Sequence, residues 1–225
     1  MIVSRLTQDV LSPQEMRLDG IVAEIMAFDR PFLEVYRSVL MPLCACVRGR
    51  WSREEATFLD ITLASGRIAL LFNSVSQAYA ERHLMMSDGE AINPGEAEAR
   101  MLLARMPGDN HALGLQIVES VFRQSGWQVS RAGENGDLDA CFGELQRDPF
   151  DLFGLSVGIS AIAGDVATAV ERARAVSCNP DLKICVGGAG VAAAPFVFDA
   201  VGADFLATDA AEGVELANAA VGFHA

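Results

Sequence analysis

The chain has 225 residues, 51% of them hydrophobic and 21% charged, and a formal net charge of −13 at pH 7. This length allows one large domain or two small ones, with enough material for a buried core. The negative charge argues against direct nucleic-acid binding, because such binding needs Lys and Arg side chains to neutralise phosphates.

Targeting and redox features indicate a cytoplasmic protein. Residues 1–12 lack the basic and apolar blocks of a signal peptide, and we interpret them as a loose leader. No apolar run approaches the roughly 20 residues that a membrane span needs. The five cysteines are an odd number and lie mostly inside apolar patterns, which indicates reduced packing residues rather than disulfides.

Residues 13–85 predict a bundle of about four helices, because apolar residues recur there at helical spacing and strand patterns are absent. One helix start is marked by Ser52 as N-cap, with Glu55 completing a capping box. The helix that follows is expected to continue to the early 80s. Residues 86–98 carry turn formers and acids with little apolar content, which predicts an interdomain linker.

Residues 99–225 alternate between strand-like and helical patterns. Five such alternations predict an α/β domain with a doubly wound, five-stranded parallel sheet. The expected strands are 99–106, 126–131, 151–157, 182–186 and 204–207, and the expected helices are 111–125, 137–147, 164–177, 191–201 and 211–220.

Polar and glycine-rich clusters follow four of the five expected strands. In a doubly wound sheet, ligands bind beyond the carboxyl ends of the strands, where the strand order switches. The clusters therefore predict a ligand site along one edge of the sheet. They are Asp109-x-His111-x-x-Gly114, Ser156-Val157-Gly158, Gly187-Gly188-Ala189-Gly190 and Thr208-Asp209.

The first cluster has the chemistry of a metal ligand with its support. The imidazole of His111 can supply a lone pair, and Asp109 can accept a hydrogen bond from the other ring nitrogen. Gly114 lets a bulky group approach the start of the following helix. An ordinary capped helix start, with Asp109 near the N-cap, accounts for the same residues.

In this order and spacing, the clusters resemble the cobalamin-binding domain, a Rossmann-like fold. The resemblance implies that His111 is the lower ligand of cobalt and that Asp109 supports it. It also implies a slot for the nucleotide tail of the cofactor, with Thr208 near its end. Ser156, Val157, Gly158, Gly187 and Gly188 would line this slot, so a side chain at either glycine is expected to fill it and leave the fold intact.

The helical half resembles the bundle that precedes this domain in methionine-synthase-like and CarH-type proteins, where a Trp-x9-Glu-His pattern covers the upper face of the corrin. Trp51 matches the tryptophan, whereas Ile61-Thr62 stand in place of Glu-His. Size, acidity and this departure are most similar to the AerR/PpaA group of cobalamin-binding antirepressors. That similarity implies light or redox sensing and a DNA-binding transcription repressor as partner. The sequence shows no Ser/His/Asp or Cys/His arrangement and no paired catalytic carboxylates, so we expect no enzymatic activity, and the net charge argues against direct contact to nucleic acid.

Other interpretations fit the same residues. A corrinoid shuttle protein of a methyltransferase system has a similar layout, and related sensory domains hold haem or no cofactor. Trp51 could simply anchor the core of the bundle. Residues 187–190 could form a generic strand-to-helix turn or a weak phosphate nest.

Overall fold

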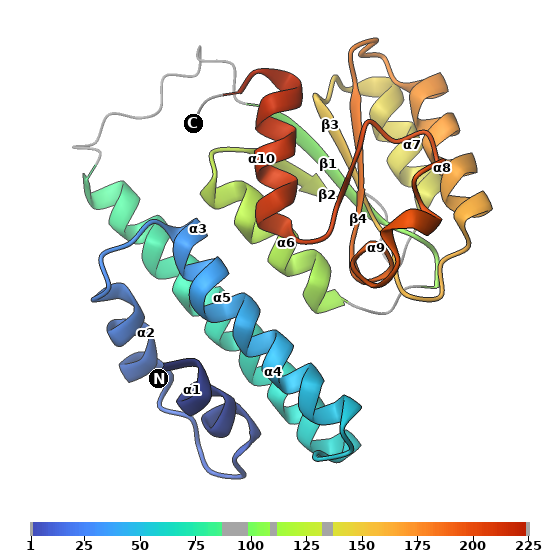
Figure 1. The fold of residues 1–225 in the computed structure, drawn as a ribbon. Coiled ribbons are helices and arrows are strands. Elements are labelled where there is room, and N and C mark those ends of the chain that lie inside the picture. The colour runs from blue at the N-terminus through green and yellow to red at the C-terminus, as the bar shows by residue number, and fades with distance from the viewer. Residues whose placement is uncertain (1, 87–98, 109–111, 132–136, 224–225) are drawn as a thin grey trace. The chain divides into compact units, whose positions relative to one another are not determined.

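The structure is a computed structural model, and it describes residues 2–86, 99–108, 112–131 and 137–223 (Figure 1). It divides into two compact units, Met1–Pro94 and Gly95–Ala225, and each is described by itself.

The first unit is entirely helical in its described part. Its longest helix, α5, packs against α1, α2 and α4. The segment η1 is a π-helix that joins α3 to α4. The elements are α1 (Ile2–Leu11), α2 (Leu18–Met26), α3 (Phe32–Val35), η1 (Tyr36–Leu40), α4 (Met41–Ser52) and α5 (Phe58–Met86).

The expectation of a loose leader over residues 1–12 is wrong, because this segment forms α1 and contributes to the core. Leu6 and Val10 are both 0% exposed. The guanidinium of Arg67 on α5 donates to backbone carbonyl oxygens at the end of α1, including that of Val10. A guanidinium presents several N–H groups in a fixed fork, so one side chain can satisfy carbonyls that the end of a helix leaves free.

The capping box expected at Ser52 and Glu55 is also wrong. Ser52 is the last residue of α4, and its hydroxyl donates to the carbonyl oxygen of Arg48 at 3.1 Å. The next helix begins five residues later than expected for this cap, after Thr57. There the hydroxyl of Thr57 accepts from the backbone N–H of Asp60 at 3.2 Å, while Asp60 Oδ2 accepts from the backbone N–H of Thr57 at 2.8 Å. This reciprocal pair is a capping box with aspartate in place of glutamate.

Helix α5 is long and apolar enough over Phe58–His83 to cross a membrane, by length and composition only. In this structure it has the character of a bundle helix. Its buried side chains recur at helical spacing and therefore share one face. They are Ala64, Ile68, Leu71, Phe72, Val75 and Tyr79.

The second unit is a five-stranded parallel sheet in the order β2-β1-β3-β4-β5, which confirms the expected fold class. Helices α6 and α10 cover one face, and α7 and α8 cover the other (Figure 1). The central strands are buried on both faces, which explains their nearly continuous apolar runs. The strands are β1 (Arg100–Arg105), β2 (Gln128–Arg131), β3 (Leu152–Ser156), β4 (Lys183–Gly187) and β5 (Phe205–Ala207).

The helices of this unit follow the expected pattern with one exception. They are α6 (Ala112–Gln124), α7 (Leu138–Arg147), α8 (Ala163–Val176), α9 (Ala189–Ala193) and α10 (Ala210–Val221), with the short 3-10 helix η3 at Pro195–Val197. The helix expected over 191–201 therefore starts earlier and ends sooner. Pro195 pushes Ala194 out of the helical region, to φ −153° and ψ 71°, and so ends α9.

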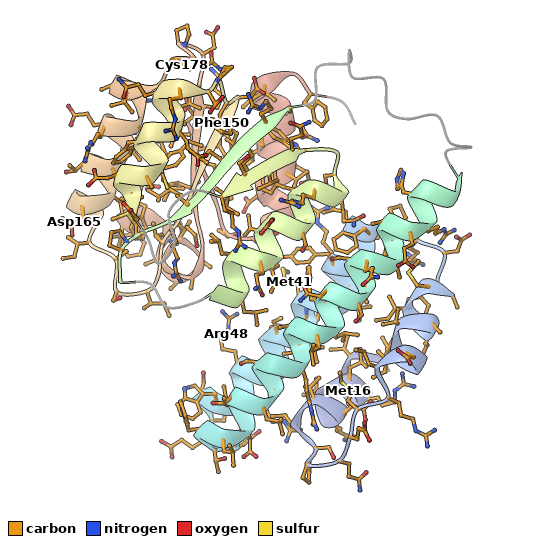
Figure 2. The ribbon with its side chains drawn as sticks, turned by 180° about the vertical axis from the view of Figure 1, so that it is seen from behind. Met16, Met41, Arg48, Phe150, Asp165 and Cys178 are labelled. Carbon is orange, nitrogen blue, oxygen red and sulfur yellow. The ribbon has the colours of Figure 1, made fainter. Side chains whose placement is uncertain are left out.

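The two edges of this sheet are easily told apart in Figure 2. Asp165, near the start of α8, lies toward the edge where the strands end. Phe150 and Cys178 lie toward the edge where β3 and β4 begin. The strand order switches beside β1, whose neighbours are β2 and β3, so the ligand edge predicted from the sequence is the edge near Asp165.

Candidate functional site

The last residues of four strands form one row across the sheet. Arg105 pairs with Ser156, Ser156 pairs with Gly187, and Gly187 pairs with Ala207. Thr208 follows directly on this row. The structure therefore brings together Ser156, Gly187 and Thr208, which lie up to 52 positions apart in the sequence.

Backbone hydrogen bonds join the loops that leave β3 and β4. The N–H of Val157 donates to the carbonyl oxygen of Gly187 at 2.8 Å, and the N–H of Gly190 donates to the carbonyl oxygen of Val157 at 3.0 Å. The side chain of Val157 is 0% exposed and packs in the core below the edge. At this position the backbone joins the two loops, while the side chain serves packing.

The paired glycines are required by the protein's own packing. Gly188 has φ +109°, and a Cβ on it would lie 2.7 Å from the carbonyl oxygen of Val157. A Cβ on Gly187 would lie 3.0 Å from the carbonyl oxygen of Ala207 in β5. We expected a side chain here to fill a ligand slot and leave the fold intact. The second part of that expectation is wrong, because a Cβ at either glycine would press on neighbouring backbone and disturb the fold, whereas the slot itself stays a prediction.

Two hydroxyl groups at the edge differ in their hydrogen bonding. Ser156 is half-buried, and no hydrogen bond within the described residues uses its Oγ. Thr208, in contrast, donates its Oγ1 hydrogen to Glu212 Oε2 at 2.6 Å and its backbone N–H to the same oxygen at 2.8 Å. Both hydrogen bonds lower the pKa of Glu212, the side-chain bond most.

Sequence reasoning missed Glu212. Its signal was available, since it stands three residues after Asp209, the N-cap of α10. Asp209 Oδ1 accepts from the backbone N–H groups of Ala211 and Glu212 at 2.8 and 3.0 Å. Glu212 thus has the sequence spacing of a capping box, but its carboxylate binds the residue before the N-cap.

Of the first cluster, only Gly114 can be placed. Asp109 and His111 lie outside the described residues, so their roles remain predictions. Gly114 belongs to the first turn of α6, and a Cβ on it would meet nothing within 4 Å. The approach of a bulky group at Gly114 stays a prediction.

Trp51, in the helical unit, is not a core residue. It is 49% exposed at the end of α4, so the core-anchor interpretation is wrong. Phe58 and Leu59, at the start of α5, are 77% and 74% exposed. Thr62, at the histidine position of the Trp-x9-Glu-His pattern, donates its hydroxyl hydrogen to the carbonyl oxygen of Phe58 at 2.8 Å. The end of this helical hairpin therefore presents large apolar side chains to its surroundings.

A cavity of about 480 Å³ opens on the α7–α8 side of the sheet. An ion pair between Asp139 and Arg172, 2.8 Å long, lies in its wall, and Arg172 stacks over the ring of Phe142. Among the predicted cofactor residues that the structure describes, none lines this cavity. Over the described ranges, no group of three His, Cys, Asp or Glu side chains is placed to hold a metal ion.

Comparison with known proteins places this geometry in context. Residues 99–216 match the family model described as the B12 binding domain. The corrinoid protein DSY3155 of Desulfitobacterium hafniense (strain Y51) is 20% identical over 98% of both chains. The HTH-type transcriptional repressor CarA of Myxococcus xanthus is 28% identical over 138 residues, which are 61% of this chain and 44% of CarA.

Solved structures agree on the fold. The monomethylamine corrinoid protein of Methanosarcina barkeri superposes with a TM-score of 0.72 at 16% identity and covers 95% of both chains. At this identity the match concerns the arrangement of the elements, and it extends over the helical region as well as the sheet.

Proposed function

We propose that this chain, which belongs to the B12 binding domain family, is a cobalamin-dependent regulator that acts on a DNA-binding transcription repressor by protein contact. Cobalamin binding itself follows from the family and from its corrinoid-protein relatives. The regulatory role is our inference.

The described residues fit the cofactor. The Ser156 hydroxyl has no partner among them, and Gly188 keeps it uncovered, since a Cβ there would come within 3.0 Å of its Oγ. The first turn of α6 is open at Gly114. We propose that Ser156, Gly158, Gly187, Gly188 and Thr208 line the slot for the nucleotide tail and that Trp51 covers the corrin. His111 would be the cobalt ligand, supported by Asp109.

The exposed end of the helical hairpin is the observation that carries the regulatory proposal. Trp51 is half exposed and is not part of the core, and the Thr62 hydroxyl donates to a backbone carbonyl oxygen of α5 itself. Bound cobalamin supplies a cobalt centre whose upper ligand responds to light or redox state. A cover built from Trp51 and apolar neighbours, without a histidine at position 62, can change its contacts when that upper ligand changes. A difference of a few kcal/mol between two such states is enough to gate a partner surface.

The similarity to the transcriptional repressor CarA supports a regulatory role. The net charge of −13 favours action through a protein over direct DNA binding, since carboxylates repel phosphates within the Debye length of about 8 Å.

Two measurements test the proposal. Absorption spectra of the protein reconstituted with cobalamins are recorded in the dark and after illumination. We expect the absorption bands of the cobalt corrinoid to differ between the two spectra. Binding of a purified photosynthesis-gene repressor to its labelled operator is then followed by fluorescence anisotropy with apo, dark and illuminated protein. We expect the three states to shift the operator titration differently and the protein alone to leave the operator unbound. Identical titrations in all three states would contradict the regulatory role.

A corrinoid shuttle is the second candidate. It is favoured by the match to a corrinoid protein over 98% of both chains and by the structural match to a monomethylamine corrinoid protein. A shuttle would carry a methyl group between enzymes and would show no dependence on light. Exchange of a radiolabelled methyl group with a corrinoid methyltransferase, measured in the dark, separates the two roles.

A further inference from the structure

The carboxyl end of β5 holds a small hydrogen-bonded unit in which one carboxylate fixes one hydroxyl group. Thr208 is exposed and directly follows the row of strand ends. Its hydroxyl hydrogen and its backbone hydrogen both point to Oε2 of Glu212, at 2.6 and 2.8 Å. Because the hydroxyl proton is committed to the carboxylate, only the lone pairs of Thr208 Oγ1 are left for another group.

Glu212 is itself held in place. Its backbone N–H donates to Asp209 Oδ1 at 3.0 Å, so its helical turn is anchored to the N-cap of α10. Within the described ranges, neither Glu212 nor Asp209 forms an ion pair with a basic side chain. A carboxylate that is ionised and positioned in this way is a strong acceptor, and it keeps the Thr208 hydroxyl in one orientation.

A second hydroxyl group in the same row, at the end of β3, behaves differently. The Ser156 hydroxyl has no hydrogen bond within the described residues, so it can rotate and either donate or accept. The two hydroxyl groups therefore differ in what they can bind. The hydroxyl on β3 can donate or accept a hydrogen bond, whereas the hydroxyl after β5 can only accept one. Two carboxylates beside the acceptor would repel a phosphate there.

We propose that Glu212 is a positioning residue that makes Thr208 an obligate acceptor, and that Thr208 receives an N–H or O–H group of the bound corrinoid. This inference deepens the cofactor site of the proposed function and rests on it. Two parts of a corrinoid carry such donors: the primary amides around the corrin ring, and the hydroxyl groups of the nucleotide tail.

Affinities for cobalamin and for cobinamide, which lacks the nucleotide tail, distinguish these sources. We expect Thr208→Val, which keeps the shape and removes the acceptor, to weaken binding about tenfold. If Thr208→Val loses affinity for cobalamin alone, the donor belongs to the nucleotide tail. If it loses affinity equally for both corrinoids, the donor is an amide of the corrin ring. Wild-type affinity of Thr208→Val for both ligands would overturn the proposal.

Glu212→Ala could also weaken binding by destabilising the start of α10, so its positioning role is tested by combining it with Thr208→Val. Glu212→Ala should weaken binding of the same corrinoid as Thr208→Val, and it should add no further loss when combined with Thr208→Val. Glu212→Gln retains an acceptor oxygen and should bind within about twofold of wild type. Additive losses in the double variant would show that Glu212 acts only through stability and would overturn its positioning role.

A matched control is Glu171→Ala, which removes the same charge from an exposed position on α8. It should bind both corrinoids as wild type does. Failure of the wild-type protein to bind either corrinoid would instead contradict the cofactor site itself. Loss of the light response with intact binding would contradict only the regulatory role.

Discussion

Gly188 approaches Val157 so closely that a Cβ on the glycine would lie 2.7 Å from the valine carbonyl oxygen. This contact joins the loops after β3 and β4, where the N–H of Val157 also bonds Gly187 at 2.8 Å. The glycine is therefore part of the framework that shapes the cofactor edge.

Substitution of Gly188 should therefore destabilise the sheet unit even when no cofactor is bound. Gly188→Ala combines a φ of +109° with a backbone clash, and we expect a loss of about 2 to 4 kcal/mol in the free energy of unfolding. Chemical denaturation of the apoprotein measures this loss. The control is Gly114→Ala, which meets open space in α6 and should raise stability by about 0.5 to 1 kcal/mol. Equal stability of both variants would show that the loop contact is not rigid.

The assignment of the cobalt ligand gives a spectroscopic prediction. His111→Ala should abolish the spectrum of histidine-ligated, base-off cobalamin, and Asp109→Ala should weaken binding about 10- to 100-fold. His83 is exposed on α5, so His83→Ala serves as the control and should leave the spectrum unchanged. An unchanged spectrum of His111→Ala would rule out the ligand assignment.

The N-cap of α5 can be tested by removing the hydroxyl groups of Thr57 and Ser52 one at a time. Thr57→Ala removes the hydroxyl that accepts from the N–H of Asp60, and we expect it to cost about 1 kcal/mol of stability. Ser52→Ala removes a hydroxyl that bonds only within α4 and should change stability by less than about 0.5 kcal/mol. Thermal unfolding compares the two. A larger loss of stability in Ser52→Ala than in Thr57→Ala would instead support the N-cap predicted from the sequence at Ser52.

The hydrogen bonds from Thr208 predict a pH dependence. They lower the pKa of Glu212 below its ordinary value of 4.5, so the unfolded chain binds this proton more tightly than the folded chain. The resulting stabilisation is present above the ordinary pKa and is lost as the pH falls through the lower folded pKa. We expect the stability advantage of wild type over Glu212→Gln to shrink between about pH 6 and pH 3. A constant difference across this range would contradict the predicted linkage.

Thiol reactivity reports the packing of both units. Cys46 and Cys178 are exposed, whereas Cys141 and Cys185 are buried. Burial raises the pKa of Cys141 to about 11 and that of Cys185 to about 12, so both remain protonated thiols at neutral pH. A maleimide should label Cys46 and Cys178 rapidly, and it should reach Cys141 and Cys185 only after unfolding. Mass mapping of the labelled peptides checks this order.

Local patterns in the sequence were enough to predict the parallel sheet, because buried strands and amphipathic helices alternate with periods that depend only on neighbouring residues. They also placed Ser156, Gly187 and Thr208 at strand ends. The same local reasoning failed for α1, whose burial of Leu6 and Val10 depends on contacts with α4 and α5. It failed again at Ser52, because whether a serine ends one helix or starts the next depends on where the chain turns.

Residue types and their spacing are enough to predict the fold class and the chemistry available at the strand ends. Which strand ends meet depends on the folded arrangement of the sheet. The row from Arg105 through Ser156 and Gly187 to Ala207 follows from strand order and register, which no local pattern encodes. The same holds for Glu212 and Thr208, because only the path of the chain between β5 and α10 brings the carboxylate onto the hydroxyl.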